Sequence, residues 1–221
     1  MQAAEDLASG SITMPPDAFF PTLRNNRLLA KRMADITIAL IALPFVFPLM
    51  SAIALAVRLS SKGPVLLQQE RIGRHGRPFI LLKFRTMVWP AETGQPLLAT
   101  PNDPRITPVG HILRRWHLDE LPQLWLVLKG EMSVVGPRLE RAYFLQQIVE
   151  QIPQYTLLFT LRPGLVSLGR VRQGYAHNMF QLLFGARRDL EYLKQIGLLQ
   201  DVKIILAAAR CILKGHLHSN Y

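Results

Sequence analysis

The longest uninterrupted apolar stretch of the chain lies near its start. Residues 36–57 contain no charged side chain. An α-helix needs about 20 apolar residues to cross the roughly 30 Å hydrocarbon core of a bilayer. A buried helix of a soluble protein is seldom so long and so uniformly apolar, because one of its faces usually meets water. The pattern therefore predicts a membrane helix, which we place with its flanks at residues 23–60.

The flanks and prolines of this stretch favour a helix that does not cross. Pro44 and Pro48 lie near its middle, and each removes a backbone hydrogen bond, so we expect a kink there. Positive charge marks the cytoplasmic side of membrane helices, and here both flanks are basic. The basic residues are Arg27, Lys31, Arg32, Arg58, Lys62, Arg71, Arg74 and Arg77. The sequence predicts a re-entrant helix that dips into one leaflet, and a straight crossing remains the alternative.

After residue 60 the hydrophobic pattern changes to short elements. Residues 64–72 and 79–87 predict two strands with turn-forming residues between them, and hence a β-hairpin. Lys83 and Arg85 are two positions apart, so we expect them to share a strand face. There they could hold a phosphate or simply face solvent. The proline-rich residues 88–108 predict a long loop that could order over a ligand.

The segment 109–138 predicts two helices and then a strand with a tight turn. Residues 109–117 have helical spacing, and Pro122 suits the first turn of a second helix that ends at Gly130. Asp119 and Glu120 then lie at a helix amino terminus. Acidic residues there often serve only as caps, but the same position also suits phosphate chemistry.

Cations near this acidic pair favour the chemical interpretation. Arg114 and Arg115 lie one turn before it, and Arg138 follows the predicted strand in a turn that would present its guanidinium. Phosphoryl transfer uses a carboxylate as nucleophile or metal ligand, together with cations that hold the transferring oxygens.

The two ends of the chain are less informative. Residues 1–22 are acidic and contain prolines, unlike a secretory signal peptide, and we expect a flexible tail. Residues 152–159 are apolar and suit either a membrane interface or the core. Residues 186–214 predict helices with a break at Gly197, and their basic, amphipathic character fits either the membrane surface or ordinary packing.

Composition narrows the class of protein. Lys and Arg number 26 against 15 Asp and Glu, so the formal net charge is +11, and hydrophobic residues make up 49% of the chain. This hydrophobic content excludes global disorder, and the charge implies an anionic partner: nucleic acid, a phosphorylated substrate or an anionic membrane. The single cysteine, Cys211, excludes an internal disulfide framework and a cysteine-rich zinc site, and fits a reducing compartment.

Four segments of the chain resemble the bacterial sugar transferases, small monotopic phosphoglycosyl transferases that act on a polyprenyl phosphate. The segments are residues 31–58, 62–87 (KGPVLLQQERIGRHGRPFILLKFRTM), 103–138 (DPRITPVGHILRRWHLDELPQLWLVLKGEMSVVGPR) and 162–171 (RPGLVSLGRV). The sequence departs from the family pattern in three places: Phe47 stands where Ser is common, Leu139 where Pro is usual and Leu168 where Trp is common.

The resemblance implies a reaction. Family members transfer a phosphosugar from a nucleotide diphosphate sugar, usually a UDP-sugar, to a polyprenyl phosphate such as undecaprenyl phosphate, and they need Mg²⁺. Nucleoside monophosphate leaves, and the lipid-linked product starts a surface glycan such as exopolysaccharide or lipopolysaccharide.

The resemblance also implies site residues. Asp119 matches the nucleophile that forms a covalent phosphosugar intermediate, and Glu120 matches the residue that supports Mg²⁺ and the site geometry. Both are candidate Mg²⁺ ligands. The candidate phosphate- and substrate-binding residues are Lys83, Arg85, Arg114, Arg115, Arg138, Asp189 and one or both of Arg170 and Arg172.

The expected architecture is an α+β fold that is membrane-associated and monotopic. It has a kinked re-entrant helix at residues 23–60 and a phosphoglycosyl transferase domain at residues 61–221, with a small hairpin or sheet and amphipathic surface helices. We expect that domain on the cytoplasmic face of the bacterial inner membrane. The alternatives are a non-catalytic membrane scaffold, a hydrolase that uses water as acceptor, and a membrane-tethered nucleic-acid-binding protein. The chain shows no recognised nucleic-acid motif, so we expect no nucleic-acid partner.

Overall fold

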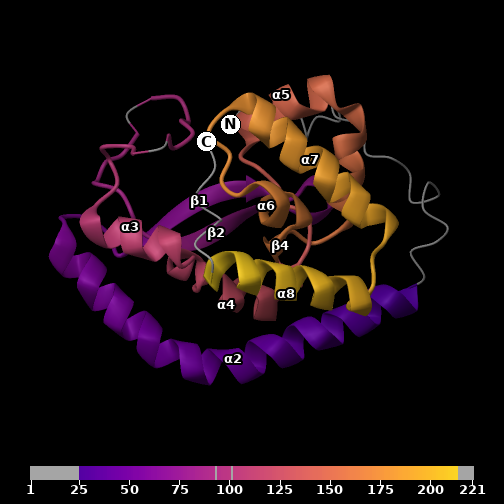
Figure 1. Cartoon of the computed structure of the whole chain (residues 1–221), viewed down its shortest axis with the longest axis horizontal. Coiled ribbons are helices and arrows are strands. Elements are labelled where there is room, and N and C mark those ends of the chain that lie inside the picture. Colours follow the sequence, from indigo (N-terminus) through magenta and orange to yellow (C-terminus); the bar gives the residue numbers. More distant parts are fainter. Residues whose placement is uncertain (1–24, 93, 101, 214–221) are drawn as a thin grey trace.

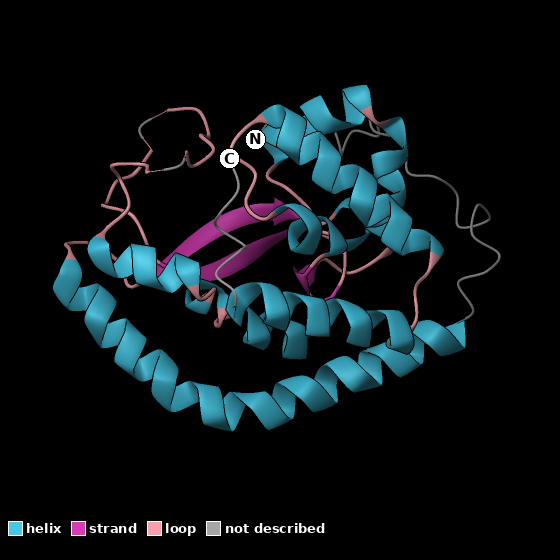
Figure 2. Cartoon of the chain, in the orientation of Figure 1, coloured by secondary structure: helices cyan, strands magenta, loops and turns pink. Residues whose placement is uncertain are grey.

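A computed structural model describes residues 25–92, 94–100 and 102–213, so the tail expected at residues 1–22 lies outside the described part. Helices surround two small sheets, and a long helix, α2 (Asn25–Ser60), runs along one side of the molecule (Figures 1 and 2). The expected mixture of helices and small sheets is confirmed. α2 is long and apolar enough to cross a membrane by length and composition.

The remaining elements follow α2 in the order shown in Figure 1. They are β1 (Leu66–Ile72), β2 (Pro78–Phe84), α3 (Pro108–Arg115), a 3-10 turn (Leu118–Glu120), α4 (Gln123–Lys129), β3 (Ser133–Val135), α5 (Ala142–Gln151), a 3-10 segment (Pro153–Thr160), β4 (Gly164–Val166), α6 (Leu168–Gln173), α7 (Met179–Lys194) and α8 (Leu198–Leu213).

β1 and β2 form the expected antiparallel hairpin, with Leu67 opposite Lys83 and Arg71 opposite Phe79. A short 3-10 turn, Arg74–Gly76, connects the strands. β2 ends at Phe84, earlier than the sequence pattern predicts. Gln69, Arg71 and Lys83 share one face of this hairpin, because side chains alternate along each strand.

β3 and β4 pair in parallel and bring two distant loops side by side. Their backbones approach so closely that a Cβ on Gly164 would lie 2.1 Å from the nitrogen of Gly136. The Gly164 N–H donates to the carbonyl of Pro137 at 3.0 Å. This contact holds the turn that precedes Arg138 against the strand that leads into α6.

The first part of α2 is bound to the folded body by buried polar contacts. The Lys31 ammonium donates to the Asp201 carboxylate of α8 at 2.6 Å. Arg32 donates to the carbonyls of Val127 and Leu128 at the end of α4, at 2.6 and 2.9 Å. Asp35 accepts from the Ser133 hydroxyl and the Val134 N–H of β3 at 2.7 and 3.0 Å.

The other end of α2 packs on a different part of the body. Ile53 and Val57 form a small buried cluster with Phe84 of β2 and Leu113 of α3. Between these two contact regions most side chains are exposed, and Phe45 is 80% exposed. Figure 1 shows that α2 is bent near its middle, the part that contains Pro44 and Pro48, and lies across the body with both ends against it.

The main core decides between the two interpretations of residues 152–159, a membrane interface or the core. Tyr155, Leu158 and Phe159 are fully buried in it, so residues 152–159 belong to the core rather than to a surface. Helices at the carboxyl end are confirmed, with α7 and α8 separated around Gly197, although α7 begins at Met179, before the predicted start.

Candidate active site

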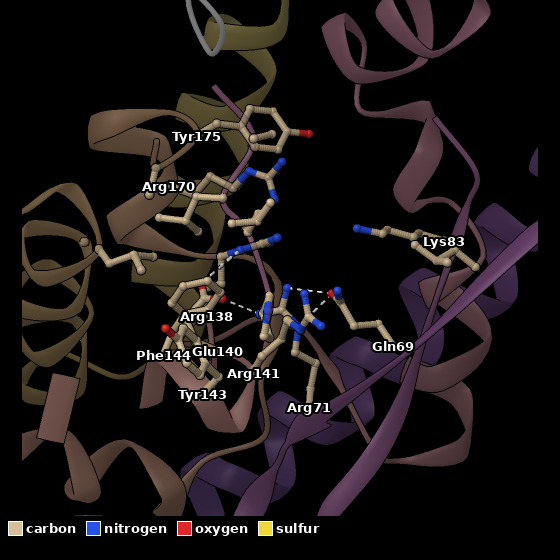
Figure 3. A pocket seen from close by; sticks show the side chains of 18 of the residues that line it. Gln69, Arg71, Lys83, Arg138, Glu140, Arg141, Tyr143, Phe144, Arg170 and Tyr175 are labelled. Carbon is tan, nitrogen blue, oxygen red and sulfur yellow. Dashed lines mark hydrogen bonds and ion pairs between the residues drawn. The ribbon is translucent and has the colours of Figure 1, made fainter. Parts of the chain in front are cut away.

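A cavity of about 740 Å³ lies between the hairpin and the helices of the second half of the chain (Figure 3). Its walls come from β1 and β2, the loop residues 86–92 and 96–99, the acidic pair Asp119–Glu120, the turn at residues 138–144, and parts of α6 and α7. The loop is tied to the opposite wall because Glu92 pairs with Arg141 at 2.9 Å and the Tyr143 hydroxyl donates to Gln95 at 3.0 Å.

A short irregular connection presents the acidic pair. α3 ends before His117, which adopts the left-handed conformation (φ 56°), and the 3-10 turn Leu118–Glu120 follows. α4 starts at Gln123, and no side chain caps it. Asp119 and Glu120 are both buried. The capping interpretation is therefore wrong, and the two carboxylates face the cavity instead.

Five side chains of alternating charge cross the floor of the cavity, and we call them the charge ladder: Arg71, Glu140, Arg138, Glu120 and Arg170. Arg71 pairs with Glu140. Arg138 lies 3.7 Å from Glu140 and 3.5 Å from Glu120. Arg170 donates to the same Glu120 oxygen at 2.6 Å. Each carboxylate of the ladder is thus shared by two guanidinium groups.

Both ends of the ladder are held in place. Arg71 also donates to Oε1 of Gln69, at 2.9 and 3.1 Å, and to the carbonyl of Leu139. Arg170 lies over the ring of Tyr175, with its guanidinium carbon 3.9 Å from the ring centroid. The same Tyr175 ring also stacks on the ring of His117, with 5.4 Å between the two ring centroids.

Asp119 and Glu120 differ in how far neighbouring cations neutralise their negative charge. Burial alone would raise the pKa of Glu120, but the charges of Arg170 and Arg138 lower it overall. Burial raises the pKa of Asp119, and the nearby Glu120 charge raises it further, against the smaller effects of Lys83, Arg170 and Arg114. Oδ1 of Asp119 has no hydrogen-bond partner among the described residues. Asp119 is therefore the carboxylate available for a ligand.

Lys83 and Arg114 supply positive charge from the hairpin side. Figure 3 shows Lys83 reaching into the cavity across from Arg138 and Arg170. Burial, followed by the charge of Arg71, lowers the pKa of Lys83 to about 8. Arg114 lines the cavity while its Nε donates to the hydroxyl of Thr86 at 2.9 Å.

Two candidate cations lie outside the cavity, and a third is engaged by backbone carbonyls. Arg85 lines the cavity beside Lys83, but its guanidinium donates to the carbonyls of Ser61 and Pro64, both at 2.6 Å, so its charge is already engaged and its part in phosphate binding stays a prediction. The strand ends at Phe84, and Arg85 turns toward the helix. Arg115 and Arg172 are exposed and do not line the cavity. The structure thus selects Arg170 over Arg172.

Asp189 lines the cavity and also supports the backbone around it. Its two carboxylate oxygens accept from the backbone N–H groups of Arg138 and Gly169, both at 2.8 Å. Burial raises its pKa to about 7 despite these hydrogen bonds. Asp189 therefore joins the turn of Arg138 to the start of α6, which carries Arg170.

Sequence reasoning missed Gln69, Arg71, Glu140 and Tyr175 as parts of the site. The alternation of Gln69, Arg71 and the opposing Lys83 on one hairpin face was an available signal for the first two. Glu140 and Tyr175 gave no local signal, because their partners are brought to them only by the tertiary fold.

The donor groups of the cavity suit Mg²⁺ better than a metal held only by protein. The described residues contain no cluster of three His, Cys, Asp or Glu that could hold a metal ion. Mg²⁺ usually takes one or two carboxylates and completes its shell with water and substrate phosphates. The unpartnered, buried oxygen of Asp119 next to Glu120 fits that mode of binding.

Comparison with known proteins adds a family. The family model described as bacterial sugar transferase matches residues 26–215. The UDP-N-acetylgalactosamine-undecaprenyl-phosphate N-acetylgalactosaminephosphotransferase of Aeromonas hydrophila is 40% identical over 185 residues, which are 84% of this chain and 44% of that protein. The UDP-glucose:undecaprenyl-phosphate glucose-1-phosphate transferase of Escherichia coli strain K12 is 40% identical over 182 residues, which are 81% of this chain and 39% of that protein.

A shorter relative matches along most of its length. The exopolysaccharide production protein PSS of Rhizobium leguminosarum is 36% identical over 186 residues, which are 80% of this chain and 92% of that protein. By contrast, this chain spans about two fifths of the length of the Aeromonas and Escherichia relatives.

Proposed function

The chain belongs to the bacterial sugar transferase family, and we propose that it transfers the phosphosugar of a UDP-sugar to undecaprenyl phosphate. The products are undecaprenyl diphosphate-sugar and UMP, and the reaction initiates a surface glycan or exopolysaccharide. The names of the relatives support this choice, since they specify UDP-N-acetylgalactosamine or UDP-glucose as donor and undecaprenyl phosphate as acceptor.

The observation that carries the proposal is the contrast between Asp119 and Glu120. Glu120 is occupied by Arg170 and Arg138, whereas Asp119 presents an oxygen without a hydrogen-bond partner in the described part of the chain. A carboxylate needs no base to become a nucleophile, but it must approach a diphosphate of like charge. Preorganised cations offset that repulsion, and such electrostatic stabilisation is usually the largest catalytic contribution.

In the first step, an Asp119 oxygen attacks the phosphorus that carries the sugar. An O–P bond forms on Asp119, and the bond to the oxygen of UMP breaks, so that UMP leaves with the electron pair. Arg138, Arg170 and Lys83 face the cavity and are placed to hold the phosphate oxygens as charge moves onto UMP.

In the second step, a phosphate oxygen of undecaprenyl phosphate attacks the same phosphorus. The new O–P bond completes the lipid diphosphate, and the bond to Asp119 breaks, which regenerates the carboxylate. Neither step requires a protein base, because both nucleophiles are already ionised. Ping-pong kinetics are expected from a covalent intermediate.

Asp119 and Glu120 are the residues that would hold Mg²⁺, and the bound ion supplies neutralisation of the phosphate charge. The charge ladder keeps Glu120 ionised and fixed in position next to Asp119.

The geometry of α2 supports a re-entrant placement in the membrane. Ala39 is fully buried in the main core and Ile53 is buried in the second cluster. At 1.5 Å per residue, the helix between them is about 20 Å long, which is shorter than a hydrocarbon core of ~30 Å. A crossing helix would need the body on both sides of the bilayer. We therefore place the whole body, residues 61–221, on the cytoplasmic face.

Exposed apolar side chains on neighbouring helices fit the same membrane plane. α3 exposes Ile112, and α8 exposes Leu199, Val202 and Leu206. Figure 1 shows both helices beside α2. They match the amphipathic surface helices expected from the sequence, and they would bring the cavity close to the lipid headgroups, where the acceptor phosphate lies.

The test is an assay of membrane-bound enzyme with Mg²⁺, undecaprenyl phosphate and a panel of UDP-sugars, read as UMP release and lipid-linked product. We expect product from at least one donor and a loss of roughly 10³-fold or more in Asp119→Asn. The control is Arg172→Gln, which removes an exposed cation outside the cavity and should retain activity.

The covalent step has its own readout. Without acceptor, the peptide that contains Asp119 should gain the mass of the phosphosugar. Full activity of Asp119→Asn would remove Asp119 as the nucleophile. Absence of product with every donor would favour the scaffold alternative, and turnover without a lipid product would favour a hydrolase.

A further inference from the structure

Two apolar residues at the edge of the cavity are open to solvent. Trp89 is 53% exposed and Val88 is also exposed. Both line the same cavity as Asp119 and Lys83. Among the described residues, Trp89 contacts no other aromatic ring and no cation, and more than half of its surface is open to solvent.

This edge lies beside the segment that follows the end of α2. Gly63 follows the end of α2 and has φ +122°, and a Cβ there would lie 2.7 Å from Cβ of Trp89. Arg85 fastens the same region by donating to the carbonyls of Ser61 and Pro64. Figure 1 shows the loop that carries Trp89 rising from the end of the molecule at which α2 finishes.

Apolar side chains are exposed both on the end of α2 and at this edge, and we call these residues the apolar track. Leu55 and Leu59 are exposed on the last turns of α2, and Trp89 and Val88 follow next to the cavity. The cations of the hairpin side, Lys83 and Arg114, lie within the cavity. A ligand entering here meets apolar side chains first and positive charge afterwards.

We propose that Trp89 and Val88 form a lip over which the isoprenyl chain of the acceptor lipid enters, so that its phosphate reaches Lys83 and Arg114. This inference rests on the proposed function. A polyprenyl phosphate has the matching order of chemistry, a long apolar chain that ends in a phosphate. A nucleotide sugar is polar along its length, so it would not use the apolar track. Indole rings are also preferred at the boundary between lipid and water.

The first experiment separates acceptor binding from donor binding. Trp89→Ser should raise the KM for undecaprenyl phosphate about tenfold, as expected for loss of one large apolar contact, and should change the KM for the UDP-sugar less than twofold. Val88→Ser should act in the same direction. Trp89 packs on Gly63, so Trp89→Ser could disturb folding. Val88 does not pack there, so Val88→Ser tests the lip without that disturbance.

A matched control is available on α4. Trp125 is also 53% exposed but does not line the cavity. Trp125→Ser, compared at equal amounts of vesicle-bound enzyme, should leave both KM values within twofold of the wild type. A rise in acceptor KM in Trp125→Ser equal to that in Trp89→Ser would overturn the lip, because it would show a general effect of surface tryptophans.

A second experiment reads binding without turnover. The chain has three tryptophans, so Trp116→Phe combined with Trp125→Phe leaves Trp89 as the sole tryptophan. Undecaprenyl phosphate in vesicles of phosphatidylcholine and phosphatidylglycerol should shift the Trp89 emission to shorter wavelength. A UDP-sugar added to the same vesicles should not. A shift with the UDP-sugar alone would instead assign Trp89 to the nucleobase of the donor and overturn the proposal.

Different results would overturn the proposed function and the proposed lip. Absence of lipid-linked product in the wild type would remove the proposed function, while the fluorescence titration would still report whether undecaprenyl phosphate contacts Trp89. Product with an unchanged acceptor KM in both Trp89→Ser and Val88→Ser would overturn the lip and leave the function standing.

Discussion

At the scale of single residues, the site distinguishes two carboxylates that are neighbours in sequence. Two guanidinium groups surround Glu120, while Asp119 keeps an oxygen without a partner among the described residues. Their environments therefore push the pKa values of Asp119 and Glu120 in opposite directions. Separation of this kind often assigns different chemical tasks to adjacent acids.

Lys83 provides a prediction about pH. Its pKa is about 8, so the ammonium is protonated below that pH and loses its charge as the pH rises above it. We expect kcat/KM for the UDP-sugar to fall above about pH 8 in the wild type, since this parameter reports the free enzyme. Lys83→Arg should remove that decline, because a guanidinium stays charged. The measurement is a profile of kcat/KM from pH 6 to 10.

The Lys83→Arg variant also serves as the control. If Lys83→Arg shows the same alkaline decline as the wild type, another group is titrating and Lys83 is excluded as its cause. Lys83→Met should give a low kcat/KM with no decline in this range.

The buried pair of Arg71 and Glu140 predicts a double-mutant result. Both side chains are largely buried, so Arg71→Gln or Glu140→Gln should each lower the free energy of unfolding by roughly 3–5 kcal/mol, as removal of one partner of a buried pair does. The double variant should lose less than the sum of the two. Chemical unfolding in detergent micelles measures the cycle, and additive losses would show that the two residues are not coupled.

The candidate residues show which parts of the site can be predicted from the sequence. Asp119, Glu120, Arg114 and Arg138 line one cavity, as their clustering in the central block suggested, and Lys83 joins them from the hairpin. Arg85 lines the same cavity as Lys83 but donates to the carbonyls of Ser61 and Pro64, because residue spacing predicts side-chain direction only while the strand continues. Glu140 pairs with a residue 69 positions away, and no local pattern contains that information.

At the scale of elements, the parallel pair of β3 and β4 positions both arginines that hold Glu120. The pair depends on the close approach of Gly136 and Gly164. Gly164→Ala would place a methyl group 2.1 Å from a backbone nitrogen, so we expect a loss of several kcal/mol of stability and of most activity. Thermal unfolding and the UMP assay measure the two effects.

Gly197 supplies the matched comparison for that variant. A Cβ on Gly197 would meet no atom within 4 Å. Gly197→Ala should therefore keep the melting temperature and activity close to the wild type. Equal damage in the two variants would show that the close backbone approach is not the cause.

The elements that sequence predicted are those with strong local patterns. The hairpin, α4 with its end at Gly130, and the helices on either side of Gly197 follow from alternation, helical spacing and turn residues. β3 and β4 are three residues each, and their parallel pairing joins segments about thirty residues apart. Such short strands carry too little periodicity to predict a partner. The placement of the acidic pair in a 3-10 turn depends on the left-handed His117, which the sequence pattern did not indicate.

At the scale of the whole molecule, α2 holds the body at two places. Its first part binds α4, β3 and α8, and its last turns pack on β2 and α3. These contacts support the proposed re-entrant placement, in which both ends of the helix lie on the same side of the membrane as the body.

A labelling experiment tests that topology. Arg27→Cys and Lys62→Cys, each made with Cys211→Ser, place one cysteine at either end of α2. A membrane-impermeant maleimide should label both from the same side of sealed vesicles, the cytoplasmic side. Labelling of the two positions from opposite sides would contradict the re-entrant placement.

The two-ended attachment of α2 also bears on how the protein is made. During synthesis α2 emerges before every element that binds it, and the Asp201 partner of Lys31 is translated 170 residues later. Under the proposed re-entrant placement, the helix would enter the lipid while Lys31, Arg32 and Asp35 still lack their partners, and the body would then close onto a segment already held in the bilayer. In that placement the membrane would act as a template during biogenesis. A chain shortened to remove α2 would fold with Asp201 and the end of α4 deprived of their partners, so cutting off the anchor is a poor route to a soluble enzyme.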